Sequence, residues 1–286
     1  MLFVSFIALY FGVALAIPTI PNRTNYTRDC SSLSPADIEA AEAHFEANKV
    51  LTTNANTEST AIIPVYWHVI RAGTALTQGN IPDSQIKDAV KVLNEDYRLT
   101  GLQFKLEKIN RVNNAKWFDY MYRKSTDETE MKQALHQGNA TALNVYTVGF
   151  SKAPGFGSNS IAFSYMPFFY AKEPKQDGVV MLYSTVPGGT EAYYNRGRIL
   201  THEVGHWAGL YHTFEGGCTP KNDRVHDTPW QNEPTYACPT GKSSCGGPDL
   251  INNFMDYTDD ICMDSFTPGQ IARMKFQVAT YRGISV

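Results

Sequence analysis

Three histidines and a glutamate lie within the segment HEVGHWAGLYH and have the residue types of a metal site. His202 and His206 are four residues apart, so on a helix they lie on one face, one turn apart. Their imidazoles can therefore bind a single metal ion. Glu203 follows the first histidine, where a carboxylate can take a proton from a metal-bound water. The spacing predicts the chemistry of a zinc hydrolase.

A third ligand is predicted just beyond the helix. Gly209 lies three residues after His206, and a glycine tolerates the positive φ that ends a helix abruptly. The chain can then turn and bring His212 back to the metal. Three neutral imidazoles leave the fourth tetrahedral position open for water, as a catalytic zinc requires. A helix with two exposed histidines is the alternative for an isolated HExxH match, and the extended spacing disfavours it.

The longer pattern HExxHxxGxxH is the metzincin signature, which also demands a methionine in a tight turn downstream. Met255 is the candidate for this turn. For a lone methionine, the alternative is a residue that fills space in the hydrophobic core. The stretch HEVGHWAGLYHTFEGGC, followed by NFMDYTDDICMDSFTPGQ, resembles the pappalysin-type metzincins, which are secreted zinc endopeptidases. The resemblance runs from about residue 61 to the C-terminus and is most specific over residues 199–270.

The resemblance implies further roles. Tyr257 assists near the zinc, where its phenol can hydrogen-bond the oxyanion of a tetrahedral intermediate. Asp260 matches an acid that lines the pocket for the residue after the cut, where it would favour Arg or Lys; a solvated turn is the alternative. Asp223, Val225 (by its carbonyl) and Thr228 match a calcium site, for which the alternative is a turn capped by aspartates.

Four of the five cysteines cluster around this region: Cys218, Cys238, Cys245 and Cys262. A segment rich in glycine and proline buries little and needs covalent cross-links. Four cysteines allow three pairings, and spacing alone cannot choose among them. The resemblance implies Cys218–Cys245 and Cys238–Cys262. A second zinc site is the competing use, which the oxidising route of secretion disfavours.

The N-terminal region predicts export. Residues 1–16 are apolar and end in Ala-Leu-Ala, which fits a cleaved signal peptide; an uncleaved anchor is the alternative. The sequons at Asn22, Asn25 and Asn139 agree with secretion and predict N-glycosylation. Residues 17–60 are polar, contain one expected helix at 35–48 and end in a linker at 51–60, which together indicate a propeptide.

Cys30 is the odd cysteine and lies in this propeptide-like segment. If the Cys30 thiolate bound the open position of the zinc, it would displace the catalytic water and keep the precursor inactive. Arg28 resembles the arginine that accompanies such cysteine switches in the family, whereas Ser31 stands where a glycine is often found. A mispaired or intermolecular thiol is the alternative.

Residues 61–286 are expected to form one catalytic domain of mixed α/β (α+β) class. The resemblance implies a metzincin-like, twisted and mostly parallel sheet, with the active-site helix in an upper subdomain and an irregular, disulfide-stapled lower subdomain. Apolar patterns predict strands at 62–70, 102–109, 143–150, 161–166 and 178–185, and helices at 82–98, 127–137, 193–208 and after Thr267. Thr267 and Gln270 are expected to form a capping box at the start of the last helix. Segment 161–166 is the candidate edge strand for extended substrate, or else an ordinary edge.

The net charge of −3 and the lack of a basic run indicate no nucleic-acid partner. After the N-terminus no stretch approaches the roughly 18 apolar residues of a membrane span. The expected protein is a secreted, extracellular endopeptidase that uses Zn²⁺, and Ca²⁺ if the loop binds it, and acts on proteins or peptides. Cleavage of a non-peptide amide and a secreted binding module with a structural zinc are the alternatives. Glu203 favours catalysis, because a structural site has no use for a base.

Overall fold

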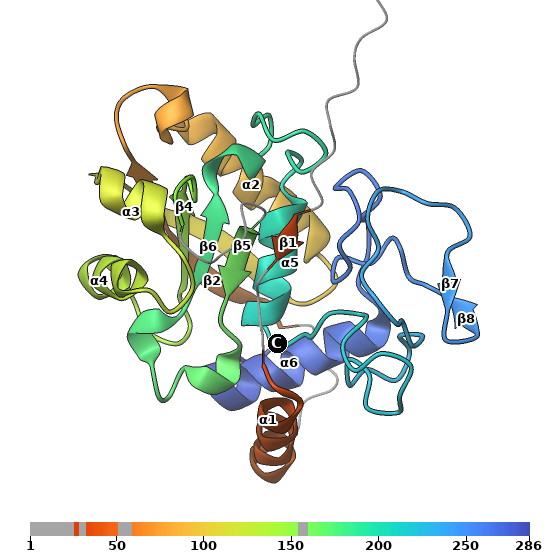
Figure 1. Cartoon of the computed structure of the whole chain (residues 1–286). Coiled ribbons are helices and arrows are strands. Elements are labelled where there is room, and N and C mark those ends of the chain that lie inside the picture. Colours follow the sequence, from red (N-terminus) through yellow and green to blue (C-terminus); the bar gives the residue numbers. More distant parts are fainter. Residues whose placement is uncertain (1–25, 29–32, 51–58, 154–159) are drawn as a thin grey trace, which may run out of the picture.

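The computed structural model describes residues 26–28, 33–50, 59–153 and 160–286. The predicted signal peptide, Asn22, Asn25, Cys30 and most of the linker lie outside these residues. The chain builds a six-stranded sheet in the order β1-β5-β6-β4-β2-β3 (Figure 1). Its strands are β1 (Thr27–Arg28), β2 (Ala61–Arg71), β3 (Leu102–Asn113), β4 (Leu143–Val148), β5 (Ser160–Ser164) and β6 (Val179–Leu182).

The sheet is mostly parallel, which confirms the predicted architecture. β3, β2, β4 and β6 are parallel neighbours, whereas β5 pairs with β6 in the antiparallel sense. β1 adds to the outer edge of β5 in parallel, with Thr27 opposite Ser160 and Arg28 opposite Ala162. The predicted edge strand therefore already carries a short strand from the chain's own N-terminal region, which the sequence analysis did not foresee.

Two apolar cores lie on opposite faces of the sheet. Successive strand residues point to opposite faces, so Val145 and Val179 belong to the larger core while Tyr146 and Val180 belong to the smaller one. The helices divide in the same way (Figure 1). Helices α2 (Asp83–Asp96), α5 (Arg198–Trp207) and α6 (Pro268–Arg282) supply the larger core, and α3 (Ala115–Tyr120) and α4 (Thr126–Leu135) supply the smaller.

The helix that carries the first two histidines is shorter than predicted, because it begins at Arg198 and not at residue 193. Tyr193 and Gly197 have φ angles of 74° and 91°, in the left-handed region that an α-helix excludes. Strand 178–185 also ends early, at β6, where a 3₁₀ turn follows. The 3₁₀ turns are η1 (Leu76–Gln78), η2 (Pro167–Phe169), η3 (Pro174–Gln176) and η4 (Tyr183–Thr185).

The chain after Gly209 is irregular until α6, as predicted for the lower subdomain. Its regular pieces are the two-residue strands β7 (Ser243–Ser244) and β8 (Gly247–Pro248), which pair with each other, and a final helix. α6 begins with the predicted capping box, in which the side chains of Thr267 and Gln270 each bond the other's backbone N–H group.

The predicted N-terminal helix is α1 (Pro35–Asn48), which lies beside α6 in Figure 1. Ser34 accepts a hydrogen bond from the Asp37 N–H group and so caps the helix. Ile38 is buried with Tyr211 and Met166 in a small apolar cluster. The helix is therefore packed on the domain. No helix in the described part of the chain is both long enough and apolar enough to cross a membrane.

Candidate metal centre

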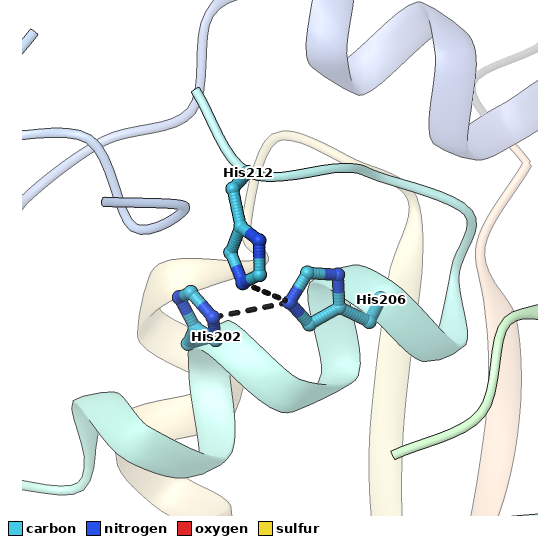
Figure 2. A group of neighbouring side chains, drawn as sticks. All are labelled: His202, His206 and His212. Atoms are coloured by element: carbon cyan, nitrogen blue, oxygen red, sulfur yellow. Dashed lines mark hydrogen bonds between the residues drawn. The ribbon is translucent and has the colours of Figure 1, made fainter. Parts of the chain in front are cut away.

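The three histidines predicted to bind a metal converge in the structure (Figure 2). His202 and His206 project from α5, and His212 returns to them from the loop after the helix. The Nε2 atom of His206 lies 3.1 Å from that of His202 and 3.1 Å from that of His212. Within the described ranges, this is the one group of at least three His, Cys, Asp or Glu residues whose ligand atoms all lie within 4.8 Å of one another.

Backbone carbonyls decide which nitrogen of two imidazoles carries a proton. The Nδ1 atom of His202 lies 2.6 Å from the Phe254 carbonyl oxygen, and that of His206 lies 2.7 Å from the Leu210 carbonyl oxygen. A carbonyl only accepts, so each Nδ1 donates, and each Nε2 of a neutral ring presents a lone pair. Two lone pairs 3.1 Å apart cannot hydrogen-bond each other. The residues therefore fit a metal cation between them.

Gly209 makes the chain reversal possible. Its φ of 101° is left-handed, and its N–H group donates to the His206 carbonyl at 2.9 Å. A Cβ at this position would lie 2.5 Å from the side chain of Gln277 in α6. Glycine is therefore required both by the backbone conformation and by the close approach of α6.

Met255 packs against α5 at Gly205, between the two helical histidines. A Cβ on Gly205 would lie 2.4 Å from Met255 Sδ, so a larger residue would push the methionine away. The turn also joins the loop beyond the helix, because the Met255 carbonyl accepts from the Thr213 N–H group at 3.2 Å. The structure thus brings the predicted methionine turn against the helix that carries His202 and His206.

Glu203 is fully buried, and a residue that the sequence analysis missed holds its carboxylate. The Ser164 hydroxyl, at the end of β5, lies 2.7 Å from Glu203 Oε2 and 3.1 Å from the Glu203 carbonyl oxygen. No spacing rule connects the end of this strand with the helix. The signal that could have found Ser164 is a serine directly after the apolar run at residues 161–163.

Tyr257 reaches the histidine group. Its phenolic oxygen lies 3.3 Å from His212 Nε2. Asp256, whose pKa is raised by burial, accepts the N–H groups of Tyr257 at 2.8 Å and Thr235 at 2.9 Å. Gln231 Nε2 donates to the same carboxylate at 3.0 Å. A buried acid thereby anchors the segment that carries the tyrosine.

Asp260 supports the start of α5. It is 2% exposed, so the alternative of a solvated turn is wrong. Its Oδ2 atom accepts from the N–H groups of Arg196 at 2.8 Å and Arg198 at 3.2 Å. A carboxylate at a helix N-terminus also interacts favourably with the helix dipole. Asp260 therefore lies one helical turn before His202.

The residues predicted to bind calcium meet in one loop. Thr228 Oγ1 lies 2.6 Å from Asp223 Oδ1 and 2.8 Å from the Val225 carbonyl oxygen. Asp223 Oδ2 is buried and has no hydrogen-bond partner among the described residues. Burial raises the pKa of Asp223 to about 7. Oxygen atoms from three residues, one of them an under-satisfied carboxylate, fit part of the coordination shell of a hard cation.

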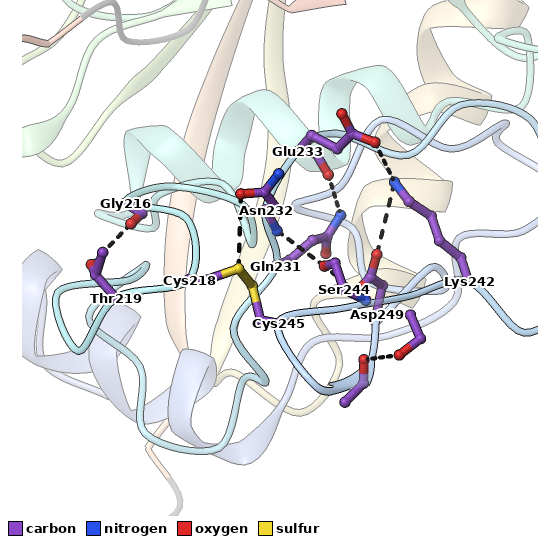
Figure 3. The surroundings of a disulfide bond; sticks show 12 residues. Gly216, Cys218, Thr219, Gln231, Asn232, Glu233, Lys242, Ser244, Cys245 and Asp249 are labelled. Carbon is purple, nitrogen blue, oxygen red and sulfur yellow. Dashed lines mark hydrogen bonds and ion pairs between the residues drawn. A yellow bond between two sulfur atoms is a disulfide. The ribbon is translucent and has the colours of Figure 1, made fainter.

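The four cysteines of the lower subdomain form two disulfides, Cys218–Cys245 and Cys238–Cys262. These are the pairs that the resemblance implies. Figure 3 shows the first bond, which joins two irregular loops. Because all four sulfur atoms are used, the competing second zinc site is excluded.

The N-terminal helix contacts the loop that carries the third histidine. Glu42 pairs with Arg273 of α6 at 2.6 and 3.0 Å and accepts a 3.0 Å hydrogen bond from the Tyr211 hydroxyl. Side-chain exposures of 14% and 8% make this a mostly buried ion pair. Tyr211 directly precedes His212, and Arg273 Nε donates to the Gly209 carbonyl at 2.9 Å.

The structure combines a mostly parallel sheet, a histidine-bearing helix that ends at a glycine, and a methionine turn packed on that helix. This combination is that of a metalloendopeptidase of the metzincin class. The chain belongs to the peptidase M43 family, because the family model described as pregnancy-associated plasma protein-A matches residues 133–279. The resemblance to pappalysin-type proteases is thereby confirmed. Since the chain is a metalloendopeptidase, the alternatives of a binding module and of a non-peptide hydrolase are set aside.

Relatives support this assignment over most of the chain. Extracellular metalloprotease 1 of Coccidioides posadasii is 37% identical and aligns over 96% of both chains. An extracellular metalloprotease of Pyricularia oryzae is 40% identical over 86% of this chain and 84% of that one. Mature mirolysin of Tannerella forsythia, solved in complex with a cleaved peptide, is 30% identical and superposes with a TM-score of 0.66. The match covers 78% of this chain and 94% of the mirolysin chain.

Proposed function

We propose that the chain is a secreted, zinc-dependent endopeptidase that hydrolyses peptide bonds of proteins. The observation that carries the proposal is the convergence of three imidazole Nε2 atoms, from His202, His206 and His212. Three neutral imidazoles are a ligand set of catalytic zinc. These three residues would hold a zinc ion, which would polarise a carbonyl group and lower the pKa of a bound water to about 7.

Glu203 is the general base of the proposed reaction. It accepts the proton of the attacking water and passes it to the leaving amine. Its burial beside the histidines and its 2.7 Å contact with Ser164 support this role, because a base must be held in a fixed orientation. Tyr257 donates a hydrogen bond to the oxyanion, which agrees with the 3.3 Å between its phenol and His212 Nε2.

The substrate is proposed to be a protein or peptide that pairs with β5. Two observations support this role: the complex of mirolysin with a cleaved peptide, and the pairing of β1 with the outer edge of β5. The extracellular names of the relatives and the sequence of residues 1–16 support secretion. Asn139, exposed in the loop between α4 and β4, and Asn22 and Asn25, outside the described residues, are proposed glycosylation sites.

Residues 17–60 are proposed to be a propeptide that precedes the catalytic domain 61–286. Within it, β1 pairs with the edge proposed for substrate, and Glu42 of α1 pairs with Arg273 beside the third histidine. A cut in the linker at 51–60 would break the covalent connection between the catalytic domain and the segment that contains β1 and α1. Cys30 lies outside the described residues, and its role as a zinc-binding switch stays a prediction from the sequence.

Two further roles complete the proposal. Asp223, the Val225 carbonyl and Thr228 bind Ca²⁺, which would give the under-satisfied Asp223 Oδ2 a partner. Asp260, buried at the start of α5, favours Arg or Lys after the cut, in keeping with the family resemblance.

The proposed mechanism predicts that Glu203→Ala keeps about one zinc per chain but loses activity by roughly 10²–10⁴-fold, the usual contribution of a general base. Ser164→Ala should lower kcat less, because the carboxylate remains but is no longer held. Cleavage of an unstructured protein, metal content and the effect of a zinc chelator are the measurements. The exposed Ser151→Ala is the control. Unchanged cleavage by Glu203→Ala, or by wild type after zinc removal, would contradict the mechanism.

The propeptide proposal predicts that Glu42→Gln weakens docking of α1 by roughly tenfold, since a charge-assisted bond contributes about 1.5–3 kcal/mol. The uncut variant should therefore be more active than the uncut wild type, and its N-terminal segment should be removed faster. Activity and mass spectrometry of the purified chain are the measurements. Glu46→Gln, on an exposed position of the same helix, is the matched control. A fully active enzyme that keeps residues 17–60 would rule the propeptide out.

The calcium proposal predicts that Ca²⁺ raises the melting temperature of wild type but not of Asp223→Asn, with the exposed Asp264→Asn as control. Without calcium, the folded-state pKa of about 7 lies above the usual value of 3.8. The folded chain then binds this proton more tightly, so stability decreases as pH rises from about 4 to about 7. This decrease should be absent from Asp223→Asn. An equal effect of Ca²⁺ on the melting temperatures of wild type and Asp223→Asn would contradict the proposal.

The proposed role of Asp260 predicts that peptides with Arg or Lys after the cut have a kcat/KM about ten to a hundred times that of matched peptides with Leu or Glu. Asp260→Asn, which retains an oxygen for the N–H groups of Arg196 and Arg198, should remove the preference and keep the fold. If basic residues give the wild type no advantage, Asp260 does not set specificity.

A further inference from the structure

The ring of Phe214 stacks on the third histidine. Its centroid lies 4.7 Å from that of the His212 imidazole, and the two planes differ by 6°. Phe214 is half-buried and follows His212 by two residues, in the loop beyond α5. The geometry is that of an offset aromatic stack, which is a favoured arrangement at this distance.

Phe214 also touches the proposed oxyanion donor. The ring of Tyr257 meets Phe214 edge to face, with centroids 5.0 Å apart and an angle of 83°. Tyr257 meets the His212 ring in the same way, at 5.1 Å and 88°. Because the rings of Phe214 and His212 are nearly parallel, the tyrosine lies perpendicular to both. The three rings thus form one mutually contacting cluster.

His212 is held differently from the other two histidines. His202 and His206 are carried by α5, and their Nδ1 atoms lie 2.6 and 2.7 Å from backbone carbonyls. His212 lies on the loop after α5, and its Nδ1 atom lies 3.6 Å from Glu215 Oε2. Stacking on Phe214 adds a restraint on the angle of a ring that no helix carries.

We propose that Phe214 is a positioning residue of the metal centre, which sets the ring angle of His212 and the place of the Tyr257 phenol. The inference rests on the proposed function of these two residues. A flat ring against one face of the imidazole opposes rotation about its Cβ–Cγ bond, and such rotation would turn Nε2 away from His202 and His206. The same ring blocks Tyr257 from tilting toward the space beside His212.

Zinc affinity of the full-length chain, measured by competition with a chromophoric chelator, tests the first half of the proposal. Phe214→Leu should bind zinc roughly 10–100-fold more weakly, the usual effect of removing a residue that orients a ligand. Phe214→Tyr keeps an aromatic ring and should restore wild-type affinity. Phe150→Leu, a half-buried phenylalanine packed with the smaller core, is the matched control and should leave affinity unchanged.

Steady-state kinetics at saturating zinc test the second half. Phe214→Leu should lower kcat more than it raises KM, because the residues that it positions act on the transition state. Tyr257→Phe should cost less in the Phe214→Leu background than in wild type, because the phenol is already displaced there. Thermal unfolding identifies variants that do not fold, and Phe214→Met replaces Phe214→Leu if the latter is one of them.

The outcomes separate this inference from the proposed function. If His212→Ala loses zinc affinity but Phe214→Leu and Phe214→Met match wild type in affinity and kcat, Phe214 does not position the site, and the metal centre stands. If His212→Ala keeps full zinc affinity, the proposed ligand set itself is wrong. An equal loss in Phe214→Leu and Phe214→Tyr would also overturn the inference, because stacking would then not be the cause.

Discussion

The arrangement of the site depends on the protonation of buried imidazoles. His202 and His206 present their Nε2 lone pairs to one point only because each Nδ1 donates to a backbone carbonyl. Neither carbonyl belongs to α5: Phe254 precedes the turn methionine, and Leu210 follows the helix. A helix with the right spacing is therefore not enough. Two loops must pack against it to within hydrogen-bond distance, and the lower subdomain supplies both.

Close packing of these loops relies on glycines and on paired buried charges. Gly205 admits the sulfur of Met255, and Gly209 admits Gln277 of α6. Irregular segments have few ladder hydrogen bonds, so they need other restraints. Asp260 binds the backbone at the start of α5, and Arg273 binds the Gly209 carbonyl at its end. Removing such a charge from water costs free energy unless the charge has a partner. Each of these segments is therefore held against a definite partner.

The sequence predicted whatever a local period or a fixed spacing encodes. The ligand spacing, the glycine after the helix and the capping box at Thr267 all act within a few residues, and the structure contains each arrangement. What it did not predict depends on tertiary approach. Ser164 meets Glu203 only because β5 pairs with β6, and α5 begins late because Tyr193 and Gly197 adopt left-handed conformations. A two-residue strand such as β1 has no period to detect.

If residues 17–60 are removed as proposed, Arg273 can serve the enzyme both before and after the cut. An unpaired sheet edge invites strand pairing, and β1 pairs with the outer edge of β5. Arg273 contacts both the N-terminal helix and the loop that leads to His212, but through different atoms. Its terminal nitrogens bind Glu42, whereas Nε binds the Gly209 carbonyl. Loss of α1 would expose the terminal nitrogens to water and leave the Nε bond in place. The loop that carries His212 could therefore keep its position if the proposed propeptide were removed.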